Sequence, residues 1–108
     1  AATGASCGVT YLMGGTKLQL SYAIKNMIGN ITGMICDGAK PSCAMKISSG
    51  VSTAMLSALM AIENKVVTSS EGIIDDDVDK SIANLTAIGS IGMEGTDKLV
   101  LQIMTKKA

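Results

Sequence analysis

The chain has 108 residues, with nine lysines balanced by nine acidic residues and no arginine, so its formal net charge is zero. This length fits one small domain, and a neutral chain without arginine lacks the basic surface that nucleic-acid binding requires. The chain also contains no histidine, which excludes histidine-containing zinc sites, Ser-His-Asp triads and Cys-His dyads formed within it.

Two helices are predicted in the first third of the chain. Apolar residues at helical spacing predict the first over residues 2–13, with Cys7 inside it and the glycines at 14–15 ending it. Thr16 is a suitable N-cap for the second helix, which we expect to run over residues 17–27.

The end of the second helix is less regular in sequence. Gly29 and Asn30 are expected to loosen the chain. Residues 31–36 are rich in β-branched side chains, but no other segment offers them a partner strand. We therefore interpret residues 31–36 as a helix end or an extended lead-in to the loop that follows.

The strongest helical pattern covers residues 43–64. One side carries apolar residues at spacings of three and four: Ala44, Ile47, Val51, Ala54, Met55, Ala58, Leu59 and Ile62. The opposite side carries small polar residues and no charge: Ser48, Ser49, Ser52, Thr53 and Ser57. Because a solvated helix usually presents charged residues there, we expect this helix to be largely buried and central.

The last third is predicted to form a connection over 65–74 and two further helices. The acidic run 75–79 suits the first turn of a helix that ends at Gly89 or Gly92, and Asp97 is expected to start the last helix after a break at 95–96. The fold class predicted is therefore all-α, a compact bundle of four to five helices with the cysteine loop between helices two and three.

Two of the three cysteines lie on that loop, which cannot be regular structure. Gly38 frees the backbone between Cys36 and Cys43, and Pro41 removes an amide donor. Three thiols without histidine suit an iron–sulfur cluster in which one iron has no cysteine ligand. The residues alone leave open that Cys7 is a small buried hydrophobe and that the loop is an unspecific pair of thiols.

Residues 29–46, Gly-Asn-Ile-Thr-Gly-Met-Ile-Cys-Asp-Gly-Ala-Lys-Pro-Ser-Cys-Ala-Met-Lys, closely resemble the C-terminal part of L-cysteine desulfidases. That family shares a superfamily with the α chain of iron–sulfur L-serine dehydratases. The segments from Ala5 to Gly15, from Glu71 to Ile74 and from Asp79 to Met104 carry weaker resemblance. Cys-Asp-Gly in place of Cys-Asp-Pro, and Lys46 in place of an arginine, point toward the desulfidase branch.

The resemblance implies a [4Fe-4S] cluster on Cys7, Cys36 and Cys43, whose open iron acts as a Lewis acid in β-elimination from L-cysteine or L-serine. The products would be pyruvate and ammonia, with hydrogen sulfide from cysteine. No general base is evident. Lys40 and Lys46 are candidates for holding the substrate carboxylate, or else are solvated lysines. A pyridoxal Schiff base on a lysine ranks low, because no phosphate-binding glycine loop accompanies it.

Other polar residues of this segment have a structural alternative. Asp37 is a candidate for orienting the cluster from outside the ligand set, or for a local Asx turn. Asn30 and Thr32 are candidates for polar groups near the substrate, or for helix-end capping.

The non-catalytic alternative is a helical packing or interaction domain with incidental cysteines. Because the chain opens without an initiator methionine, inside an apolar pattern, we expect residues 1–108 to be a single domain at the C-terminal end of a longer enzyme. We expect this domain to be inactive when it is isolated from the rest of that enzyme. The N-terminal remainder and a small amino-acid substrate are the expected partners, and a homo-oligomer is left open.

The odd cysteine count does not suit a secreted disulfide scaffold, and we find no signal peptide, polybasic anchor or membrane-length apolar run. We therefore expect a cytoplasmic location, with no membrane or nucleic-acid partner.

Overall fold

Helices make up all the regular structure in residues 1–107, which are the residues that this computed structural model describes. They are α1 (Ala2–Leu12), α2 (Lys17–Ile31), α3 (Cys43–Ile62), α4 (Val78–Ala87), the π-helical turn η1 (Ile88–Gly92) and α5 (Glu94–Thr105). The predicted all-α class is confirmed, and so is the position of the cysteine loop between the second and third helices.

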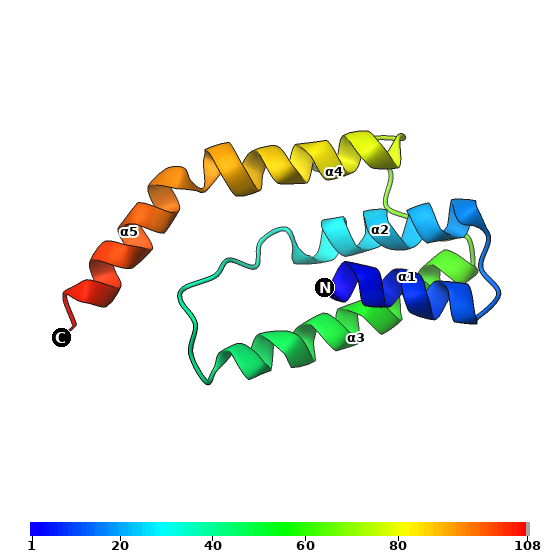
Figure 1. The fold of residues 1–108 in the computed structure, drawn as a ribbon. Coiled ribbons are helices and arrows are strands. Elements are labelled where there is room, and N and C mark those ends of the chain that lie inside the picture. Colours follow the sequence, from blue (N-terminus) through cyan, green and yellow to red (C-terminus); the bar gives the residue numbers. More distant parts are fainter. Residues whose placement is uncertain (108) are drawn as a thin grey trace.

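The first three helices form a small bundle in which each packs directly on the other two (Figure 1). The seam between α1 and α3 consists of small residues. A Cβ at Gly50 would lie 3.3 Å from the Cβ of Ala2, and the Ser6 hydroxyl donates a hydrogen bond of 2.9 Å to the Ala54 carbonyl. Small side chains let the two backbones approach closely, which is how a chain with few aromatic rings achieves dense packing.

The buried face of α3 is therefore not the apolar stripe that the sequence predicted. The buried residues are small: Gly50, Ala54, Ser57, Ala58 and Ala61. Most of the large apolar residues are exposed: Met45, Ile47, Val51, Met55, Leu56 and Leu59. The expectation of a largely buried helix is wrong for residues 1–107, because α1 presents Ala2 and Ser6 to α3 and this narrow surface selects the small side of the helix.

Asn26 ties the three-helix bundle to the connection that follows α3. Its side chain is only 3% exposed, and its amide donates to the carbonyls of Ser57 (3.3 Å) and Lys65 (3.0 Å). Its carbonyl oxygen accepts a 3.0 Å hydrogen bond from the backbone N–H of Val67. One buried amide thus hydrogen-bonds to the backbone of α3 and to two backbone groups of the connection that follows it.

Two helix boundaries differ from the sequence prediction. The N-cap predicted at Thr16 is confirmed, and Gln19 completes a capping box with it, but α2 continues through Gly29 and Asn30 to Ile31. A Cβ at Gly29 would lie 3.2 Å from Val67, so this glycine admits the connection close to α2 and does not end the helix. Likewise α5 begins at Glu94 instead of Asp97, with Gly95 inside its first turn.

The last part of the chain extends away from the bundle. In Figure 1, α4 lies beside α2, and η1 and α5 continue it toward the cysteine loop. The described residues measure 50 × 27 × 16 Å, with a radius of gyration of 15.4 Å against about 13 Å for a compact domain of this length. This elongated shape leaves many large apolar side chains exposed.

Helix α3 is also long enough and apolar enough in composition to cross a membrane, which corrects the expectation that the sequence holds no such run. Core helices of soluble proteins meet the same criterion, and α3 packs against both α1 and α2. The absence of a membrane partner remains a prediction.

Candidate functional site

The cysteine loop, residues 32–42, leaves the end of α2 and enters α3 at Cys43. Cys36 is exposed, whereas Cys43 is partly buried as the first residue of the helix, where its thiol donates to the Gly38 carbonyl at 3.3 Å. Gly38 has a φ of +109°, a conformation that side-chain-bearing residues rarely adopt. The glycine therefore sets the turn that brings the chain from one cysteine to the other.

Asp37 is the centre of the charge arrangement on this loop. Its carboxylate accepts hydrogen bonds from Lys40 and from Lys46, the latter at 2.8 Å. Lys46 also donates to the Ile35 carbonyl at 3.0 Å. The hydrogen bonds from Lys40 and Lys46 are the main reason why the pKa of Asp37 lies well below its ordinary value.

Lys46 is the second cationic partner of the Asp37 carboxylate. Its pKa is raised, chiefly by the hydrogen bond to Asp37. With one carboxylate against two ammonium groups, the Asp37–Lys40–Lys46 triad keeps one excess positive charge.

An open cavity of about 510 Å³ lies against the triad. It is lined by Ile35, Asp37, Lys40, Ser42, Met45, Lys46 and Ser49. A cavity of this size with an excess positive charge at its edge can receive a small molecule that carries a carboxylate, such as an amino acid.

Helix α5 reaches the other side of the loop. A second cavity of about 380 Å³ lies between Asp37, Lys40 and the last turns of α5. A Cβ at Gly38 would lie 2.6 Å from the terminal methyl carbon of Met104, so the flexible Met104 side chain would have to shift to admit a larger residue there. The last helix thus packs on the segment that joins the two cysteines.

Cys7 lies apart from these groups. It is partly buried in α1, and its thiol faces the Leu20 carbonyl of α2 at 3.9 Å. Burial raises the pKa of the Cys7 thiol. Within residues 1–107, no three cysteine or acidic side chains come close enough together to hold a metal ion. As arranged in this chain, the three thiols therefore do not fit a shared cluster.

The two polar candidates at the end of α2 also lie away from the cavity beside the triad. Asn30 is exposed and lines a separate pocket that includes Met60 and Val67. Thr32 is the C-cap residue of α2, and its hydroxyl donates to the Ile28 carbonyl.

Sequence reasoning missed two contributors to this site, the Ile35 carbonyl and the side chain of Met104. The spacing of three between Asp37 and Lys40 could have suggested their pairing. No sequence pattern could have placed Lys46, nine residues away, on the same carboxylate.

Comparison with known sequences gives a match over most of the chain. The family described as serine dehydratase alpha chain matches residues 1–102. A protein named UPF0597 protein from Parabacteroides distasonis is 84% identical over 108 residues, which are all of this chain and 25% of that protein. Proteins of the same name from Porphyromonas gingivalis and Oleidesulfovibrio alaskensis are 75% and 49% identical over 107 residues, 99% of this chain and 25% of each protein. No solved structure matches. The chain thus spans about a quarter of the length of these curated relatives.

Proposed function

The chain belongs to the serine dehydratase alpha chain family, and from this premise we propose that the longer protein it forms part of is an iron–sulfur-dependent amino-acid lyase. The reaction proposed is β-elimination from L-serine or L-cysteine, which yields pyruvate and ammonia, with hydrogen sulfide in the second case. We also propose that residues 1–108 are the C-terminal part of that protein and that it works in the cytoplasm. The quarter-length coverage of the relatives supports a longer protein, and the C-terminal position is proposed from the resemblance of residues 29–46.

The observation that carries the proposal is the position of Lys46. The family match includes the cysteine loop, and there Lys46 is hydrogen-bonded to Asp37 beside an open cavity. An amino-acid substrate brings a carboxylate, which an ammonium group can hold by a charge-assisted hydrogen bond.

Asp37 decides how the two lysines would act on that carboxylate. Because both already donate to Asp37, a substrate carboxylate would meet one net positive charge instead of two. Lys40 and Lys46 would then orient the substrate through their remaining donors, since an ammonium group has three. Asp37 would hold both lysines in place and fix the direction in which they point.

Cluster binding is the part of the proposal that the arrangement of the thiols does not match. Cys36 and Cys43 share the loop, whereas Cys7 faces α2 and its pKa is raised by burial. A cluster held by all three would require a rearrangement of α1 or of the loop in the longer protein. We therefore propose Cys7, Cys36 and Cys43 as ligands of the full-length protein and derive no step of the reaction from the cluster.

Anaerobic purification of the full-length protein tests the proposal. We expect broad absorption near 400 nm, lost on Cys36→Ala, and pyruvate formation from L-serine or L-cysteine. Lys46→Met should raise KM, because it removes a carboxylate partner, whereas the matched control Lys80→Met, an exposed lysine on α4, should leave KM unchanged. A colourless, iron-free protein after anaerobic reconstitution, or no pyruvate from either amino acid, would refute the lyase.

A second candidate is a non-catalytic packing domain with incidental cysteines. The exposed apolar side of α3 favours it, because such a surface usually marks a contact with other protein. The two candidates differ in the effect of Cys36→Ala, which would change neither colour nor activity in a packing domain.

A further inference from the structure

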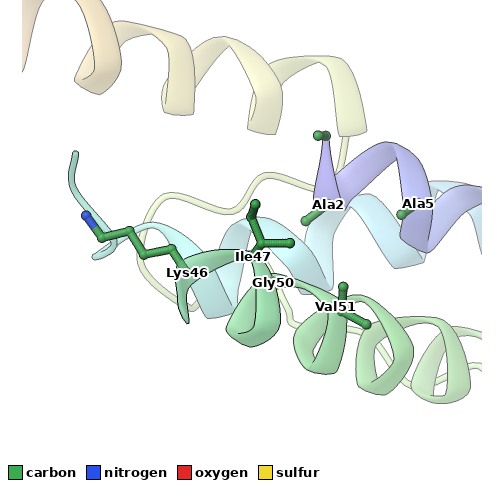
Figure 2. A pocket seen from close by; sticks show the side chains of 7 residues that line it. Ala2, Ala5, Lys46, Ile47, Gly50 and Val51 are labelled. Carbon is green, nitrogen blue, oxygen red and sulfur yellow. The ribbon is translucent and has the colours of Figure 1, made fainter. Parts of the chain in front are cut away.

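An apolar groove lies between the start of α1 and the first turns of α3. It encloses about 360 Å³ and is lined by Ala1, Ala2, Ala5, Lys46, Ile47, Gly50 and Val51. Figure 2 shows Ile47 and Val51 on α3, Ala2 and Ala5 on the neighbouring turns of α1, and the Lys46 side chain extending away from them. Apart from Lys46, every residue of the groove is apolar, so the groove is better suited to a protein segment than to a polar small molecule.

Helices α1 and α3 run in the same direction and in a fixed register. Gly50 lies against Ala2, and one turn later Ala54 accepts the hydrogen bond from Ser6, so each pair of neighbours is 48 residues apart. The first turn of α1 therefore lies opposite Gly50. The first two turns of α3, including Cys43, Lys46 and Ile47, extend beyond the start of α1 with no helix beside them at this groove.

We propose that the segment immediately preceding Ala1 in the longer protein fills this groove by extending α1 along the first turns of α3. This inference rests on the proposed position of residues 1–108 at the C-terminal end of the protein. At 1.5 Å per residue, about six further helical residues before Ala1 would bring the segment level with Cys43. The second and third residues before Ala1 would then lie beside Ile47 and Lys46.

Two observations favour this occupant over a second copy of the chain. The groove begins at Ala1 itself, so the adjoining segment reaches it without a connecting loop. The relatives are about four times as long as this chain, so ample polypeptide exists outside it. A consequence is that residues just before Ala1 border the cavity beside Lys46 and supply side chains that residues 1–108 lack.

Site-specific photo-crosslinking in the full-length protein tests the proposal. Ile47→p-benzoylphenylalanine places the probe in the groove, and Leu56→p-benzoylphenylalanine is the control, because Leu56 is also exposed (51% against 69% for Ile47) but lies nine residues further along α3, on its opposite side. After irradiation and digestion, mass spectrometry should find the Ile47 probe linked to a peptide within about six residues before Ala1. The Leu56 probe should not link there.

Three results would overturn the proposal: a link from position 47 to a remote part of the polypeptide, a link between two copies that doubles the mass, or no link. The readout does not depend on activity or on iron. A colourless protein that gives the expected link refutes the lyase but not the docked segment, and an active protein without the link refutes only the docked segment.

Discussion

Asn26→Ala should loosen the connection after α3 far more than Asn30→Ala, one turn further along the same helix. The Asn26 side chain is buried and bonds to Ser57, Lys65 and Val67, whereas Asn30 is exposed. Truncation removes the acceptor of the Val67 N–H and a donor to the Lys65 carbonyl. The Ser57 carbonyl lies inside α3 and has its own helical partner, so its loss counts little.

The magnitude follows from the two groups left without partners. A buried polar group that loses its partner costs about 1–3 kcal/mol. Lys65 is exposed and Val67 partly so, which lets water replace some of the loss. The cost should therefore lie near the lower end, about 2–3 kcal/mol for both groups together. Since 1.4 kcal/mol is a factor of ten, local opening should become about 30- to 150-fold more frequent.

Hydrogen exchange followed by mass spectrometry on the full-length protein measures this opening in a peptide covering residues 64–70. Exchange in Asn26→Ala should be faster by about that factor, and exchange in Asn30→Ala should match the parent protein. Equal exchange in the two variants would show that Asn26 does not hold the connection.

Four further predictions concern the charges, the thiols and a helix cap. Asp37→Asn should return the pKa of Lys46 toward its ordinary value, so at about pH 9 more free amine is present and acylation of Lys46 is faster. The lowered pKa of Asp37 means that its pairing contributes stability above about pH 4 and persists at pH 3, where an ordinary aspartate is largely protonated; carboxyl NMR shifts measure this. Cys36 should react with a maleimide before Cys7, whose thiol is partly buried and has a raised pKa. Thr16→Ala should cost about 1 kcal/mol through the lost capping box, measured as a lower unfolding midpoint.

The acylation, labelling and capping predictions each have a control. Lys80, an exposed lysine on α4 outside the Asp37–Lys40–Lys46 triad, should acylate at the same rate in Asp37→Asn as in the parent protein. If Lys46 is equally unaffected, the hydrogen bond to Asp37 does not set its pKa. Maleimide labelling in denaturant should equalise the two thiols; if the order under native conditions is reversed, the burial assigned to Cys7 is wrong. Thr68→Ala, which removes a loop hydroxyl outside any helix, should leave α2 unaffected.

The helical class was predictable because the periodicity of the sequence is clear and local. Thr16 with Gln19, and Gly14 with a φ of +84°, act through neighbours only a few residues away, so the sequence pattern alone locates the end of α1 and the start of α2. Gly29 was misread for the opposite reason. Its role depends on Val67, 38 residues later, and no local pattern carries that information.

The buried face of α3 shows a further limit of sequence reasoning. Periodicity shows that large apolar residues share a side of the helix, but not which surface of its neighbours they meet. Here α1 offers Ala2 and Ser6, and only the small side of α3 fits against them. For the candidate site, the loop and its two cysteines were found from sequence, whereas the shared carboxylate partner of Lys46 and the contact of Met104 required the folded chain.

The small-residue seam also determines how this part of the protein responds to temperature. Seven apolar residues are buried within residues 1–107, and four of them are alanines. Unfolding residues 1–107 alone would therefore expose little new apolar surface. The heat-capacity change should then fall below the usual 12–15 cal/mol/K per residue or so, which makes the curve of stability against temperature shallow. Contact with the rest of the longer protein would bury the large side chains of α3 and restore the ordinary curvature. In calorimetry of the longer protein, the heat-capacity change contributed by residues 1–107 would therefore come mainly from their contacts with the rest of that protein.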